Sequence, residues 1–405
     1  MSSDLTFAAP GNVVAHRARK SWPDQLESSA DIARVALVHE RFTEFAGSEQ
    51  VVAQLAELWP TATVSTPVVD PSVLPPELRG RVTGTALSRL LRPGGGYAHL
   101  LPALPVAMRH LDLGRPDVVV ASHHAFADQV VHATSAPVVA YVHSPARWVW
   151  DPQMRSGEIG GRLGGAGLAA FAAAYRSRDR AAAQRLTSVL ANSHAVAERI
   201  RDWWGRDAAV VHPPVDTEWY SPDSSEPRED FFLLAGRLVP YKQPALAVRA
   251  ARKAGVRLIV AGDGRSRAEC EALAGPGTEF VGRVSDSELR SLFRRAAAVL
   301  MPGVEDFGIV PVEAQACGTP VIATGAGGAL DSVIPGRTGQ LVPPGDDGLV
   351  DRWAGTLAGF DPARYDPAAI RRHAEGFSRA VFRQRMDEHV TAVLRGVPTP
   401  LGHAA

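Results

Sequence analysis

Short apolar stretches rich in β-branched residues recur along this chain, and segments of helical character lie between them. In the first half these stretches cover residues 34–39, 62–65, 117–121, 138–142 and 188–193. In the second half they cover residues 231–235, 257–261, 278–281, 298–301, 320–323 and 339–342. Strands that alternate with helices form βαβ units, in which helices cover both faces of a parallel sheet. The sequence therefore predicts an α/β fold with doubly wound parallel sheets.

Two Pro- and Ser-rich segments, residues 212–216 and 221–227, separate the two runs of strands. A chain of 405 residues also exceeds the size of one ordinary hydrophobic core. Two doubly wound domains would bind a ligand in the cleft between the carboxyl ends of their strands. We predict a poorly ordered extension at residues 1–30 and two Rossmann-like domains at residues 31–222 and 223–376. A C-terminal helix with a tail would follow at residues 377–405.

Composition excludes several classes of protein. Apolar residues make up 45% and charged residues 21% of the chain, which is typical of a soluble globular protein. Basic and acidic residues number 43 each, so no nucleic-acid partner is expected. The only two cysteines, Cys270 and Cys317, argue against a disulfide framework and a cysteine-rich metal site. The chain has neither a transmembrane run nor an apolar secretory signal, so we expect a cytoplasmic protein.

Two carboxylates lie eight positions apart in the second half of the chain, on either side of a Phe-Gly-Ile turn. Glu305 precedes the turn, and Glu313 follows it in a segment where Pro311 suits the first turn of a helix. The N-terminus of a helix favours anions and a close approach of ligand. The two glutamates are therefore candidates to hold the hydroxyls of a sugar or a ribose. The alternative is a solvated loop glutamate and a glutamate that caps the helix.

A basic loop directly follows the first predicted strand of the second half. It begins at Gly236 and carries Arg237 and Lys242, five residues apart. A guanidinium and an ammonium group above a sheet can neutralise a pyrophosphate. Such preorganised cations would also stabilise a departing nucleoside diphosphate. The alternative is a solvated basic loop.

These two segments resemble the E-x7-E and G-R-x-x-x-x-K motifs of glycosyltransferase family 4, whose members are retaining enzymes with the GT-B fold. The resemblance implies that two Rossmann-like domains face a central cleft, with the acceptor bound by the first domain and the donor by the second. Glu305 would contact the donor sugar, Glu313 the ribose, and Arg237 and Lys242 the phosphates. The segment at residues 280–289 resembles the part of the family that binds the base. The remaining donor contacts implied by the resemblance come from Gly236, Arg283, Val284, Phe307, Gly308 and Ile309.

The first half contains two further resemblances to this family. Residues 46–49 resemble its G-G-x-E loop and place Gly47 near the donor, although Ala46 replaces the first glycine and leaves the backbone geometry there open. Residues 143–151 resemble the H-S/T-P-x-R-x-x-W-D segment of mannosyltransferases that build bacterial surface polysaccharides. That segment places His143 near the donor sugar and the attacking hydroxyl. The pair His123 and His124 has no third metal ligand at a suitable spacing.

Together these motifs predict a retaining, nucleotide-sugar-dependent glycosyltransferase. The residues expected in catalysis are His143, Arg237, Lys242 and Glu305. The family is thought to react by front-face displacement, in which the donor phosphate takes the acceptor proton. No D-x-D motif is found, so we expect neither a metal nor any cofactor other than the nucleotide-sugar co-substrate.

The resemblance at residues 143–151 indicates mannose from GDP-mannose as the donor, and other donors stay open. The expected acceptor is a glycan or a lipid-linked molecule in cell-surface polysaccharide or glycolipid synthesis. A peripheral association with the inner membrane face is compatible with an Arg-rich helix expected at residues 175–185, for which the alternative is a solvated helix face. The alternatives are a GT-B phosphorylase, a nucleotide-sugar hydrolase and a non-catalytic nucleotide-sugar-binding protein.

Overall fold

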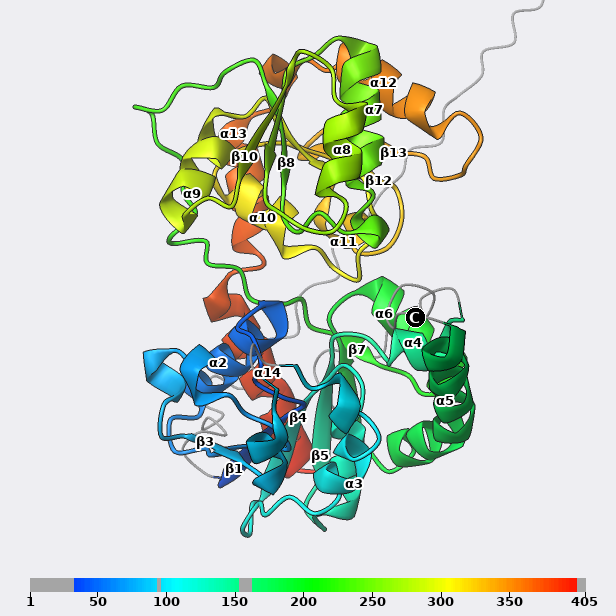
Figure 1. Cartoon of the computed structure of the whole chain (residues 1–405). Coiled ribbons are helices and arrows are strands. Elements are labelled where there is room, and N and C mark those ends of the chain that lie inside the picture. The colour runs from blue at the N-terminus through cyan, green and yellow to red at the C-terminus, as the bar shows by residue number, and fades with distance from the viewer. Residues whose placement is uncertain (1–32, 93–95, 153–161, 399–405) are drawn as a thin grey trace, which may run out of the picture.

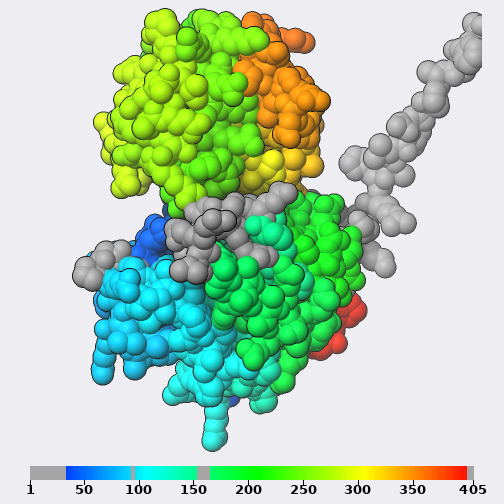
Figure 2. Space-filling model, turned by 45° about the vertical axis from the view of Figure 1, so that its right-hand side comes forward, coloured from blue at the N-terminus to red at the C-terminus, as the bar shows by residue number. Residues whose placement is uncertain are grey.

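The computed structural model describes residues 33–92, 96–152 and 162–398, which fold into two α/β lobes (Figure 1). Each lobe is built on a parallel sheet, with seven strands in the first lobe and six in the second. In the space-filling view, the second lobe (yellow-green to orange) forms a mass of its own above the first (Figure 2). The predicted α/β fold with two doubly wound sheets is therefore confirmed.

The first sheet has the strand order β3-β2-β1-β4-β5-β6-β7. Its strands are β1 (Val35–His39), β2 (Val64–Thr66), β3 (Val82–Gly84), β4 (Val118–His123), β5 (Val138–Val142), β6 (Ser188–Ala191) and β7 (Ala209–Val210). Side chains of β1 alternate between two apolar cores, since Val35 and Leu37 pack on one face and Ala36 and Val38 on the other. Burial of both faces explains why the strands are nearly continuous apolar runs.

Helices cover both faces of this sheet. They are α2 (Gly47–Leu58), α3 (Leu104–Met108), α4 (Arg147–Trp150), α5 (Arg162–Ala183) and α6 (His194–Trp204). Short 3-10 turns link these elements at η1 (Pro71–Val73), η2 (Pro76–Leu78), η3 (Ala86–Leu90), η4 (Ala98–Leu100) and η5 (Ala127–His132). None of the helices in the described part of the chain is long and apolar enough to cross a membrane.

The second sheet has the order β10-β9-β8-β11-β12-β13. Its strands are β8 (Phe232–Ala235), β9 (Leu258–Ala261), β10 (Thr278–Gly282), β11 (Ala298–Met301), β12 (Val321–Thr324) and β13 (Gly339–Val342). The helices and 3-10 turns of this lobe are η7 (Pro240–Lys242), α7 (Pro244–Ala254), α8 (Arg267–Leu273), α9 (Asp286–Arg295), α10 (Ile309–Ala316), α11 (Ala329–Ser332), α12 (Leu349–Ala358), η8 (Pro362–Arg364) and α13 (Pro367–Glu375). The strand order changes direction between β8 and β11, which is where doubly wound sheets bind ligands.

The chain crosses between the lobes twice, and the two crossing segments pair with each other. The main-chain nitrogen of Val215 donates to the carbonyl of Phe377 at 2.9 Å, and the nitrogen of Arg379 donates to the carbonyl of Val215 at 3.2 Å. After the second crossing, α14 (Arg379–Leu394) returns to the first lobe and lies beside α2 (Figure 1). Its side chains Phe382 and Met386 are part of the first lobe's core.

Candidate active site

Lys242 and Glu305 form an ion pair at the carboxyl ends of two neighbouring strands. Lys242 ends the turn η7 after β8, and Glu305 follows β11, which pairs with β8. Lys242 Nζ lies 3.0 Å from Glu305 Oε1, and the two side chains are 20% and 22% exposed. Gly303 permits this contact, because a Cβ there would lie 2.5 Å from the Cα of Lys242. The strand order thus brings these two predicted residues together.

The rest of the basic loop lines a small cavity beside this ion pair. Gly236, Arg237 and Pro311 of α10 are among the residues that line the cavity. The exposed Arg237 contacts the hydroxyl of Tyr241 at 3.4 Å through Nη2. An anion in this cavity would meet two cations and the N-terminal turn of α10.

Glu313 lines a larger cleft, of about 750 Å³, between the two lobes. Tyr220, Asp216 and Asp286 share that cleft with it. Burial raises the pKa of Glu313 to about 7; Asp286 and Asp216 add to this rise, and Lys242 opposes it. The carboxylate is therefore poorly stabilised in the free protein. Donors such as the two hydroxyls of a ribose would stabilise its charged form.

The Phe-Gly-Ile turn lies between these two glutamates and faces the first lobe. Gly308 has a φ of 85° and precedes the first residue of α10, and a Cβ there would lie 2.8 Å from Met301 Sδ. The ring of Phe307 is buried and therefore serves packing. A Cβ on Gly47, at the start of α2, would lie 3.4 Å from Ile309 Cδ1. The N-terminal ends of α2 and α10 thus meet across the lobe interface.

The loop before α2 tolerates alanine in place of the first glycine of the family motif. Ala46 has a φ of −131°, an extended conformation that any residue can adopt. Its main-chain nitrogen donates to Glu49 Oε2 at 3.0 Å, which caps α2. The backbone conformation at position 46 therefore does not require glycine.

His143 belongs to a buried polar chain at the carboxyl ends of β1, β4 and β5. Its Nε2 lies 2.8 Å from Ser122 Oγ, which lies 3.1 Å from His39 Nδ1. His39 Nε2 in turn lies 3.2 Å from Glu49 Oε1. Burial, with a smaller effect of His39, lowers the pKa of His143 to about 3, so the imidazole is neutral at pH 7. His143 does not line either cavity that contains the two glutamates.

The predicted base-binding segment lies at the edge of the same cleft. Arg283 and Val284 connect β10 to α9, and Ser285 caps that helix by accepting from the nitrogen of Glu288 at 3.3 Å. The cleft lining includes Asp286 but not Arg283 or Val284. Ser285 and Glu288 form a capping box at the start of α9.

Asp306 is a functional candidate that the sequence analysis did not single out. It follows Glu305 directly, and its Oδ1 accepts hydrogen bonds from Arg147 Nη2 and, at 2.6 Å, from Arg199 Nη1. Both arginines belong to the first lobe, and Arg199 Nη1 also donates to Ser144 Oγ at 2.8 Å. The residue beside the predicted sugar ligand therefore ties the two lobes together. The adjacent carboxylates at 305 and 306 are the only sequence signal for this role.

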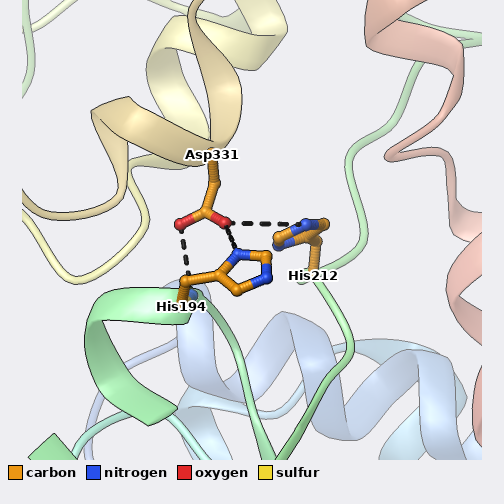
Figure 3. Close-up of side chains that lie close together, drawn as sticks. All are labelled: His194, His212 and Asp331. Carbon is orange, nitrogen blue, oxygen red and sulfur yellow. Dashed lines mark hydrogen bonds and ion pairs between the residues drawn. The ribbon is translucent and has the colours of Figure 1, made fainter. Parts of the chain in front are cut away.

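Asp331 forms a second contact between the lobes (Figure 3). Its Oδ2 accepts from the main-chain nitrogen of His194 at 3.2 Å, and its Oδ1 contacts His194 Nδ1. His212 Nε2 lies 3.9 Å from the same Oδ1. The ligand atoms of these three residues lie close enough together to hold a metal ion. The carboxylate already satisfies the N-terminus of α6, however, so the arrangement is complete as a link between the lobes.

The sequence shows no third metal ligand at a suitable spacing from His123 and His124, but in the fold two carboxylates lie near His123. Asp128 and Asp179 place oxygens within 4.8 Å of a ring nitrogen of His123. Asp179 accepts from the indole nitrogens of Trp150 and Trp204 at 2.6 and 2.8 Å. Burial raises the pKa of Asp179 to about 6. These hydrogen bonds within the core explain the cluster as part of the packing.

Comparisons with known proteins agree with this architecture. One family model, Glycosyltransferase Family 4, matches residues 45–219, and another, Glycosyl transferases group 1, matches residues 217–356. Two facing Rossmann-like lobes and a C-terminal helix that returns to the first lobe define the GT-B class. The chain belongs to glycosyltransferase family 4, so the resemblance seen in the sequence is confirmed.

Curated relatives match part of the chain. A stretch of 194 residues is 38% identical to the D-inositol 3-phosphate glycosyltransferase of Mycolicibacterium paratuberculosis and covers 43% of this chain and 43% of that protein. A stretch of 220 residues is 36% identical to the enzyme of the same name from Mycobacterium tuberculosis strain F11 and covers 47% of this chain and 45% of that one. The match thus spans less than half the length of these relatives.

Solved structures with the same fold match nearly the whole chain. Anabaena HepE in complex with UDP is 19% identical with a TM-score of 0.66, over 89% of this chain and 100% of that one. Sucrose-phosphate synthase from Thermosynechococcus elongatus is 20% identical with a TM-score of 0.66, over 90% and 100%. At these identities the likeness shows the fold alone.

Proposed function

We propose that this protein is a retaining glycosyltransferase that transfers a sugar from a nucleotide sugar to a hydroxyl of an acceptor. One observation carries the proposal. The ion pair between Lys242 and Glu305 lies at the point where the strand order of the second sheet reverses, with Arg237 on the same loop. A sugar diphosphate needs cations for its phosphates and an acceptor group for its hydroxyls, and this arrangement supplies both.

Each residue has a definite task in this reaction. Lys242 and Arg237 stabilise the negative charge that develops on the departing diphosphate. Glu305 accepts a hydrogen bond from a hydroxyl of the donor sugar. It is not the nucleophile, because the acceptor hydroxyl attacks the sugar directly and a phosphate oxygen of the donor takes its proton. Glu313 binds the ribose. For His143 the proposal rests on the resemblance at residues 143–151, which places it near the donor sugar and the attacking hydroxyl; its imidazole is neutral and lies 2.8 Å from Ser122 Oγ.

The donor and the acceptor are narrower proposals. Mannose from GDP-mannose is supported by the resemblance at residues 143–151, whereas solved neighbours of the same fold were crystallised with UDP and UDP-glucose. The acceptor is a glycan or a lipid-linked molecule of cell-surface polysaccharide or glycolipid synthesis. We place the reaction in the cytoplasm, at the inner face of the membrane.

The test is a panel of nucleotide sugars that includes GDP-mannose and UDP-glucose, with released diphosphate as the readout. We expect turnover with one donor that depends on an acceptor hydroxyl, and NMR of the product should show a retained anomeric configuration. Lys242→Ala should abolish most of this turnover, whereas Lys253→Ala, a 56%-exposed lysine of the same lobe, should not. Release of diphosphate to water alone, or to inorganic phosphate alone, would contradict the transferase proposal.

A further inference from the structure

A cavity of about 300 Å³ lies in the first lobe beside residues 305–308, which we call the donor loop. Arg147 lines it and also pairs with Asp306, the neighbour of Glu305, so the cavity adjoins the predicted position of the donor sugar. Much of its wall is apolar or aromatic and comes from Tyr97, Leu101, Leu104, Phe126, Trp148 and Leu168. A cavity at this place is where a second substrate would reach the donor.

The polar part of this wall includes Arg41, whose guanidinium forms no ion pair with a carboxylate of the described residues. Arg41 is half-buried, stacks on the Tyr97 ring at 4.2 Å and donates to His124 Nε2 through Nη1. Among the residues that the structure describes, no carboxylate forms an ion pair with Arg41, and its buried Nε has no hydrogen-bond partner. A guanidinium at the wall of a cavity that has no carboxylate partner is a favourable place for an anionic ligand.

Two further N–H groups of the cavity residues are also without partners. His124 accepts from Arg41 through Nε2, so its proton is on Nδ1, and this buried Nδ1 has no partner in the described structure. The buried Nε of Arg147 is in the same state. The carboxylate of Glu40, which also lines the cavity, accepts from four main-chain nitrogens at residues 124–127. Among the described residues that line the cavity, the buried side-chain atoms without a partner are therefore all donors.

We propose that the acceptor carries a phosphate ester, which binds between Arg41 and Arg147, and that the group next to this phosphate packs on the apolar wall. This proposal rests on the proposed transferase function, because it identifies the class of its acceptor. A phosphate matches an excess of N–H donors, and guanidinium groups bind it in a bidentate manner. Aromatic and leucine side chains would cover the carbon skeleton that the phosphate carries.

The test measures binding of phosphate probes while a nucleoside diphosphate saturates the donor site, which keeps the probes away from Arg237 and Lys242. The probes are octyl phosphate, myo-inositol 1-phosphate and, as the uncharged control, octyl glucoside, all below micellar concentrations. We expect octyl phosphate to bind at least tenfold more tightly than octyl glucoside. The inositol phosphate distinguishes the sources of the phosphate, since equal affinity indicates a soluble ester and weaker affinity a lipid-linked one.

Variants at Arg41 separate an anion site from general packing. Arg41→Gln should weaken both phosphate probes about 10- to 100-fold, as expected for loss of a hydrogen bond to a charged group. Arg41→Lys keeps the charge without the planar fork and should weaken them less. Arg115→Gln removes the same charge from an exposed position of the same lobe and should have no effect.

Unchanged phosphate affinity in Arg41→Gln, or equal binding of octyl glucoside and octyl phosphate, would overturn the inference. Arg41→Lys provides a second measurement if the glutamine variant does not fold. Failure of the wild-type protein to bind any nucleoside diphosphate would count against the proposed function instead. The two readouts are independent, so the two failures are distinguishable.

Discussion

Replacing Glu313 by glutamine tests whether this carboxylate is held ready for a ligand. Its pKa rises from 4.5 to about 7, first through burial and then through Asp286 and Asp216. Such a rise means that the folded protein binds the proton more tightly than the unfolded chain, so the free energy of unfolding falls as pH rises from about 4.5 to 7. The full shift corresponds to about 3 kcal/mol above pH 7. Because the cleft is open to solvent, we expect Glu313→Gln to gain about 1–3 kcal/mol at pH 8 and little at pH 4.5.

Urea denaturation from pH 4.5 to 8.5 measures this difference directly. Glu279→Gln, at an exposed carboxylate of the same lobe, is the matched control and should follow the wild type at every pH. The same Glu313→Gln variant should bind nucleoside diphosphate about 10- to 100-fold more weakly, because the ribose loses a charged acceptor. Binding to the wild type should release a proton near pH 7, which titration calorimetry in two buffers detects. If the stability curves of Glu313→Gln and wild type run parallel over the whole pH range, the carboxylate is not strained in this way.

Four further outcomes follow from the site. Lys242→Ala should lower turnover about 100- to 1000-fold, and near wild-type turnover would remove the lysine from the phosphate site. Glu305→Gln should weaken the complete donor but leave the affinity for free nucleoside diphosphate nearly unchanged, as calorimetry with both ligands would show. Asp306→Asn should raise KM for the donor severalfold and make the lobes more mobile by small-angle scattering; an unchanged scattering profile would mean that the ion pairs do not hold the lobes. Chelator should leave turnover unchanged, and recovery by added magnesium or manganese would contradict a metal-independent site.

Much of the fold could be predicted because its signals are local. A helix was expected around Pro311, which suits a first helical turn, and the structure has α10 at Ile309–Ala316. Two strands were missed, β3 at Val82–Gly84 and β7 at Ala209–Val210. They are the edge strands of the first sheet, and two or three residues are too few to show an apolar pattern.

The site could be predicted only in part. The pairing of Lys242 with Glu305 follows from two loops that leave adjacent parallel strands, so motif positions and strand order together indicate it. The contacts of Asp306 with Arg147 and Arg199 join residues that are 159 and 107 positions apart and lie on different lobes. No periodicity or spacing encodes such a contact, because it depends on how two separately folded lobes face each other.

Three successive residues of the donor loop are each fixed to a different part of the molecule. Glu305 pairs with Lys242 of the second lobe, and Asp306 pairs with arginines of the first lobe. The ring of Phe307 stacks on His212, with ring centroids 5.4 Å apart, in the segment that leads from the first lobe toward the first crossing. A donor phosphate that draws Lys242 away from Glu305 therefore disturbs a loop whose next two residues are attached to the first lobe and its connection. Donor binding and the relative position of the lobes are thus linked through one continuous stretch of backbone, which gives a physical reason for acceptor binding in the first lobe to respond to the donor in the second.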